Sequence, residues 1–72
     1  MKTIDINSPE GNVFTILGYA KSFQRQLKKE NLTNLEIDNV LANYQSMEYE
    51  EILNGLTKSR LFKFIDNEND FN

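Results

Sequence analysis

The stretch from Ser8 to Asn31, SPEGNVFTILGYAKSFQRQLKKEN, constrains the fold most, because it carries both the start and the stop signals of one long helix. The Ser8 hydroxyl can accept a hydrogen bond from an unpaired N–H of the first turn, and Pro9 suits the first helical position. Glu10 lies near the positive end of the helix dipole and Lys28 near the negative end. Asn31 tolerates the left-handed conformation that ends many helices. We therefore predict that this stretch forms the longest helix of the chain.

Two different faces run along this predicted helix. One is an apolar stripe at helical spacing, made of Val13, Ile16, Leu17, Ala20, Phe23 and Leu27. Nearly opposite lies a line of small residues with an aromatic residue on either side, made of Gly11, Thr15, Gly18 and Ser22 with Phe14 and Tyr19. Glycine inside a helix costs about 0.5–1 kcal/mol relative to alanine, so Gly18 calls for a compensating reason.

Small residues let another backbone approach closely, and aromatic neighbours add contact area. We therefore predict that this second face is an interface, and that the chain forms a homo-oligomer, most simply a dimer. Three other readings remain open. The helix is an ordinary one with two chance glycines, or the small face packs inside the monomer against the strands, or it is reserved for a host protein.

The chain has 72 residues, no cysteine and no histidine. A chain of this length forms one domain, here spanning residues 1–72, and buries a modest fraction of its surface. Without cysteine, neither disulfides nor cysteine-ligated zinc can brace the fold, so self-association is one remaining source of stability. Without histidine, the chain lacks the commonest general base and the commonest metal ligand. We expect no catalytic residue, no cofactor and no metal site.

The remaining segments predict an α+β fold in the order strand, helix, helix, helix, strand. Lys2–Ile6 alternates and reads as a short strand. Thr33 and Glu36 fit a capping box that opens a second helix ending near Gln45, and Ser46 can cap a third. Gly55 lies inside the third helix or ends it. Residues 61–65, LFKFI, read as a second strand, the alternative being a continuation of the third helix. We predict that the two strands form an antiparallel pair covered by the three helices. We expect the core to contain Ile16, Ala20, Phe23, Val40, Leu41, Ile52, Leu53 and Leu56.

The sequence contains partial motifs for metal, anion and nucleic-acid binding. Asp66, Glu68 and Asp70 superficially resemble a calcium loop, but the turn glycine and closing glutamate are missing, so we predict a frayed acidic tail over residues 67–72. The N–H groups at the mouth of the first helix could hold an anion. Three successive helices also suggest a helix-turn-helix. However, the chain from Asn31 to Thr57 contains no lysine or arginine, so nucleic-acid binding by these helices is not expected.

One resemblance covers most of the chain. The pattern DI-x-x-P-x-GN-x-F-x-x-LG-x-A from Asp5 to Ala20, the YE-x-IL segment from Tyr49 to Leu53, and the Phe-Ile-Asp end are similar to small uncharacterised proteins of tailed phages and prophages. The "GN-x-F" and "LG-x-A" elements are its most specific part. The resemblance implies a phage-type accessory protein. It brings no active site with it.

Together these observations predict a non-enzymatic protein that acts by protein–protein contact and associates with itself. It would modulate a host enzyme or defence system. The N-terminus lacks a signal peptide and no apolar run reaches transmembrane length, so we expect the cytoplasm, that of the host if the chain is phage-encoded. The alternatives are a small-molecule or nucleotide binder at the N-terminus of the first helix, and a phage transcriptional regulator.

Overall fold

The computed structural model describes residues 1–66 and contains three α-helices, two short 3-10 helices and one two-stranded sheet. In chain order the elements are β1 (Lys2–Asp5), η1 (Pro9–Gly11), α1 (Val13–Lys29), α2 (Leu35–Asn43), η2 (Tyr44–Ser46), α3 (Tyr49–Lys58) and β2 (Phe62–Ile65). The expected order of strand, three helices and strand is confirmed. The expected tail at residues 67–72 lies outside the described residues.

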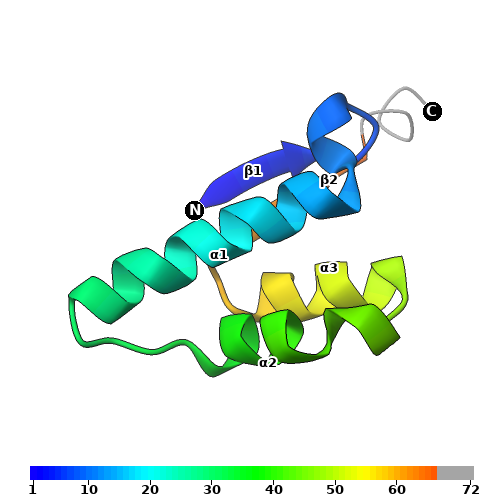
Figure 1. Cartoon of the computed structure of the whole chain (residues 1–72). Helices are drawn as coiled ribbons and strands as arrows, with labels where there is room; N and C mark the ends of the chain where they lie inside the picture. The colour runs from blue at the N-terminus through cyan, green and yellow to red at the C-terminus, as the bar shows by residue number, and fades with distance from the viewer. Residues whose placement is uncertain (67–72) are drawn as a thin grey trace.

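The two strands pair in parallel, with Ile4 opposite Phe64, so the predicted antiparallel sheet is wrong. The reason is the number of helices between the strands. The chain reverses direction between β1 and α1, again at each turn between helices, and once more between α3 and β2 (Figure 1). Four reversals return it to its starting direction. The predicted strand over residues 61–65 is confirmed, because residues 62–65 form β2 rather than an extension of α3.

The first helix begins one turn later than predicted. Ser8 and Pro9 start η1, where the Ser8 hydroxyl accepts from the Glu10 N–H at 3.2 Å. Asn12 then caps α1, its side-chain oxygen accepting from the Phe14 N–H at 2.9 Å. With 17 residues, α1 is the longest described helix, as expected.

The end of α1 follows the sequence prediction closely. Asn31 has φ of 59°, the left-handed conformation that asparagine tolerates. Two backbone bonds close the turn: the Leu32 N–H donates to the Leu27 carbonyl at 2.9 Å, and the Asn31 N–H donates to the Lys28 carbonyl at 3.1 Å. This pair of bonds is the Schellman motif, which satisfies carbonyls that have no partner inside the helix.

The caps of the other two helices differ from prediction. Asn34, not Thr33, caps α2: its side-chain oxygen accepts from the Glu36 and Ile37 N–H groups at 3.1 and 3.2 Å. Glu48, not Ser46, precedes α3, and its N–H donates to the Glu51 carboxylate at 2.9 Å. In both cases the cap lies one or two residues further along the chain. The residues between α2 and α3 form η2 instead of a direct connection.

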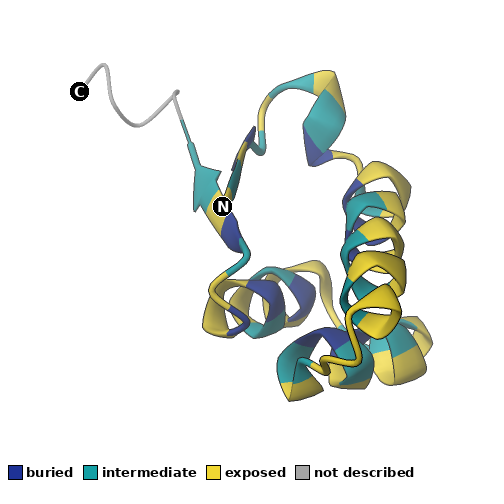
Figure 2. Cartoon of the chain, turned by 90° about the vertical axis from the view of Figure 1, so that its left-hand side faces the viewer, coloured by how far each residue is buried: buried dark blue, intermediate teal, exposed yellow. Residues whose placement is uncertain are grey.

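The core lies between the two-stranded sheet and the helices. α2 packs against α1 and α3, on the side that faces away from the sheet (Figure 1). The buried positions of the strands and helices turn inward (Figure 2). The buried apolar residues are Ile4, Ile16, Leu17, Ala20, Ile37, Val40, Ile52, Leu56 and Phe62. Of the expected core, Ile16, Ala20, Val40, Ile52 and Leu56 are buried, while Phe23, Leu41 and Leu53 pack at its edge.

Gly55 lies inside α3 rather than at its end. A Cβ built on Gly55 would lie 2.7 Å from the Val40 Cγ2, so its missing side chain lets α2 and α3 approach closely. The helix instead ends at Lys58 with Ser59 as its C-cap, and Arg60 takes the left-handed position with φ of 65°. An arginine there is uncommon and carried no sequence signal.

Candidate functional site

Gly11 does not belong to an exposed interface, which corrects one member of the predicted set. It is buried, and a Cβ at this position would overlap the backbone oxygen of Ile6 and lie 2.6 Å from its carbonyl carbon. The glycine is therefore required by the close approach of the segment that leaves β1. This matches the reading in which part of the small face packs inside the monomer.

Tyr19 is half-buried and is also engaged within the chain. Its hydroxyl donates to the Glu10 carboxylate at 2.5 Å, and the Lys2 ammonium lies 4.4 Å from the centre of its ring. Lys2 and Glu10 form an ion pair at 3.6 Å. The Tyr19 hydrogen bond, with the Lys2 charge adding to it, lowers the pKa of Glu10. The stabilisation by this cluster is therefore present above the unfolded-state pKa of Glu10 and is lost as the pH falls through the folded-state pKa.

The other predicted interface residues, Phe14, Thr15, Gly18 and Ser22, are exposed. A Cβ on Gly18 would meet nothing within 4 Å, so the described chain gives no packing reason for this glycine. Phe14 is 75% exposed, which is unusual for a large aromatic side chain on an otherwise well-packed helix. The monomer therefore covers α1 on its apolar face and leaves most of the small face open.

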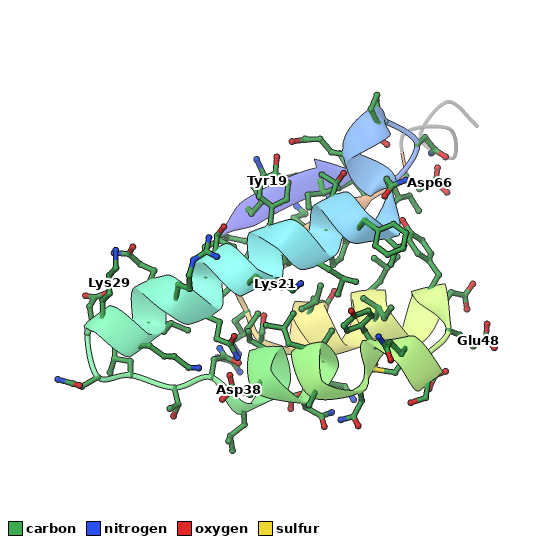
Figure 3. All side chains as sticks on the ribbon, viewed as in Figure 1. Tyr19, Lys21, Lys29, Asp38, Glu48 and Asp66 are labelled. Atoms are coloured by element: carbon green, nitrogen blue, oxygen red, sulfur yellow. The ribbon has the colours of Figure 1, made fainter. Side chains whose placement is uncertain are left out.

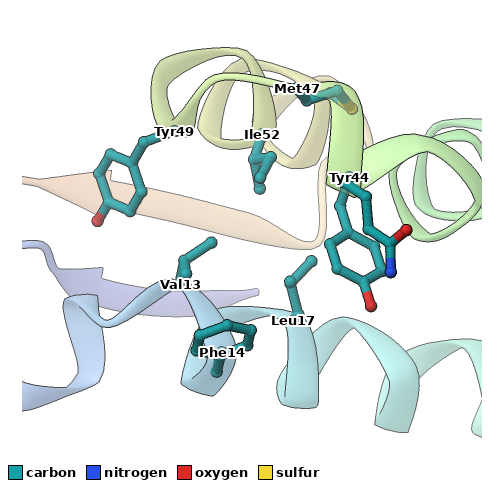
Figure 4. Close-up of a pocket in the computed structure, with 8 residues that line it drawn as sticks. Val13, Phe14, Leu17, Tyr44, Met47, Tyr49 and Ile52 are labelled. Carbon is teal, nitrogen blue, oxygen red and sulfur yellow. The ribbon is translucent and has the colours of Figure 1, made fainter.

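Phe14 stands at the rim of an apolar groove of about 450 Å³. The groove lies between the first two turns of α1 and the connection from η2 into α3 (Figure 4). Val13 and Leu17 form one wall with Phe14, and the opposite wall is formed by Tyr44, Gln45, Met47, Tyr49 and Ile52. Each lining residue is uncharged, so the groove suits an apolar group.

Two tyrosines fix the ends of the groove. Tyr49 lies across from Val13, and Tyr44 lies across from Leu17 (Figure 4). The Tyr49 hydroxyl donates to the Gly11 carbonyl at 2.6 Å and so ties the start of α3 to the start of α1. Burial raises the pKa of Tyr49, so the hydroxyl stays a donor to a higher pH than an exposed tyrosine would. The groove is thus closed at this end by a bond within the chain.

Opposite charges stand near the two ends of the groove. Lys21 follows Leu17 by one helical turn, at the end occupied by Tyr44, and Glu48 directly precedes Tyr49. Both side chains are exposed, and Figure 3 shows Lys21 on α1 and Glu48 at the start of α3, well apart from each other. The groove therefore has an apolar centre and a charge of each sign at its margins.

The sequence predicted only Phe14 among the groove-lining residues as a contact residue. Met47 lies between two helices and had no periodic pattern to place it. Tyr44 and Tyr49 recur with the apolar residues of α2 and α3, so their spacing indicated core positions. An excess of aromatic residues at helix ends was the available signal, but it does not show which ends meet.

The three N–H donors of the suggested anion site, those of Glu10, Gly11 and Asn12, are engaged within the chain. The N–H of Glu10 donates to the Ser8 hydroxyl, that of Gly11 to the Ser8 carbonyl at 2.9 Å, and that of Asn12 to the Pro9 carbonyl at 3.3 Å. The Glu10 carboxylate adds a negative charge beside them. These three groups are therefore used by the turn itself rather than turned to a phosphate.

Within residues 1–66, no group of three or more acidic, histidine or cysteine side chains is arranged to hold a metal ion. No helix in that part of the chain combines the length and apolarity needed to cross a membrane. The fold is that of a small, mostly helical protein with a parallel two-stranded sheet and an apolar groove. Comparisons with protein-family models, curated proteins and solved structures find no match.

Proposed function

We propose that this chain is a small, non-enzymatic interaction protein that binds other protein surfaces through the groove and Phe14. It self-associates and acts in the cytoplasm, in keeping with the phage-type accessory proteins it resembles. The observation that carries the proposal is an aromatic side chain, 75% exposed, at the rim of an uncharged groove of about 450 Å³. Exposed aromatic anchors beside apolar pockets are the features that dominate protein–protein binding energy.

The geometry favours a protein partner over a small ligand. The groove is bounded by only about two turns of α1, and Phe14 projects beyond its rim. A small ligand in the groove would cover only the part of Phe14 that lines it, whereas a protein surface would also cover the rest of the exposed ring. The two alternatives raised by the sequence gain no support, because the N–H groups of Glu10, Gly11 and Asn12 are bonded within the chain and the stretch from Asn31 to Thr57 has no basic residue.

The chain provides a matched pair of variants to test this proposal. Phe14→Ser removes the groove-side anchor, and Leu35→Ser removes a second apolar side chain that is 80% exposed but lies at the start of α2, outside the groove. Immobilised wild type and both variants would be offered a soluble copy of the chain and a bacterial lysate, and the captured proteins would be quantified. Phe14→Ser should reduce capture by about tenfold or more, the effect of losing an anchor residue.

Leu35→Ser should capture as much as the wild type. Urea unfolding of each protein checks that both variants keep the wild-type stability, as expected for exposed positions. Capture that is equal for all three proteins would contradict the proposal. Equal losses in both variants would show that exposed apolar surface in general, rather than the groove, makes the contacts.

A further inference from the structure

We infer that the groove is occupied by a second copy of this chain, in a two-fold dimer in which Phe14 of each copy lies over the groove of the other. This inference rests on the proposed function and names the partner of the same surface. A two-fold contact requires a self-complementary patch, meaning that a feature and its receptor lie side by side on one molecule. Phe14 and the groove satisfy this requirement, because the exposed ring borders the cavity it would fill.

The charges at the groove margins determine how the copies are turned. Lys21 stands on α1 at one end and Glu48 before α3 at the other, so the line between them crosses the groove diagonally (Figure 3). A two-fold axis in the plane of contact, perpendicular to this line, places Lys21 of each copy on Glu48 of the other. The same rotation moves Phe14 from the α1 wall of one copy over the groove of its partner, toward Tyr49.

This arrangement gives two opposite-charge pairs around an apolar centre. Turning the second copy so that like ends of the groove meet would lose both pairs. The acidic character of the chain from Asn31 to Thr57 strengthens the choice, because its five charged residues are all acidic while α1 carries Lys21, Arg25, Lys28 and Lys29. Complementary potentials of this kind fix orientation more than they add affinity.

Charge exchange between copies tests the arrangement. Lys21→Glu alone brings two carboxylates together in both pairs, and Glu48→Lys alone brings two ammonium groups together. Each variant should raise the dimer dissociation constant about three- to tenfold by sedimentation velocity, as expected for exposed pairs. An equimolar mixture of the two variants should restore association, because a mixed dimer again offers a pair of opposite charges at each of its two contacts.

Rescue by mixing separates an intermolecular contact from damage to folding, since a misfolded variant is not repaired by another chain. Lys63→Glu, an exposed position on β2 away from the groove, serves as the charge control and should leave association unchanged. A wild type that stays monomeric, single variants that associate normally, or a mixture that stays weak would each overturn the two-fold dimer. If the wild type still associates but the charge variants do not behave as expected, the groove remains the proposed contact surface and only this two-fold arrangement fails. If the wild type stays monomeric while capture from a lysate still depends on Phe14, the proposed self-association fails with this inference, and the groove remains a surface for another protein. If that dependence is also absent, both fail.

Discussion

Two glycines that the sequence predicts on one helical line, Gly11 in η1 and Gly18 in α1, have opposite roles at the residue scale. Gly11→Ala should destabilise the fold by about 1–3 kcal/mol, the usual cost of overpacking, because its Cβ would overlap the Ile6 carbonyl group. Gly18→Ala should stabilise it by about 0.5–1 kcal/mol, because alanine improves helix propensity and its Cβ meets nothing within 4 Å. Urea unfolding of both variants measures the two effects.

The comparison is internally controlled, since the two changes are chemically identical. Equal effects of the two substitutions would contradict the described path of the chain from β1 into α1. The sequence could place both glycines on one face of a helix, but it could not distinguish them. The reason for Gly11 is a contact with Ile6, which no helical periodicity encodes.

At the scale of elements, one side chain joins the ends of two helices. The Asn34 side-chain oxygen caps α2, and its amide nitrogen donates to the Ser59 carbonyl at the end of α3, at 3.0 Å. The Ser59 hydroxyl in turn donates to the Leu56 carbonyl at 2.5 Å and accepts from the Leu61 N–H at 3.2 Å. The turn that leads into β2 is therefore held by a side-chain network that begins at the start of α2.

Asn34→Ala should cost about 1–3 kcal/mol, because it removes a helix cap and leaves the Ser59 carbonyl without this donor. Thr33→Ala is the control and should change the free energy of unfolding by less than about 0.5 kcal/mol, as for an exposed residue. Thermal and urea unfolding report both values. A larger loss for Thr33→Ala than for Asn34→Ala would place the cap where the sequence alone suggested it.

The helix ends show which parts of the fold the local sequence predicts. The left-handed end at Asn31 was predictable, because asparagine is one of the few residues that adopts it readily. The predicted starts of α2 and α3 are wrong by one or two residues. At α2 both Thr33 and Asn34 can cap a helix, and at α3 both Ser46 and Glu48 can. Which of them caps depends on the tertiary position of Ser59 and on η2.

At the scale of the whole molecule, the sequence predicted the number and order of the elements but not the direction of the sheet or the groove. Strand patterns in β1 and β2 carry no information about their relative direction, which follows from the four reversals between them. The groove is lined by residues from two segments, 13–17 and 44–52. It therefore exists only when the fold brings these two segments side by side. Periodicity identified both sets as partly apolar without showing that a space remains between them.

The central claim, that the groove with Phe14 at its rim is the surface through which the protein meets its partner copy, is tested most directly by NMR. Backbone amide spectra recorded across a dilution series follow the described residues other than Pro9 at once. We predict concentration-dependent shifts for residues 13–21 and 44–52, with β1 and β2 unchanged. Spectra that stay constant over the whole series, or shifts confined to the strands, would contradict the claim.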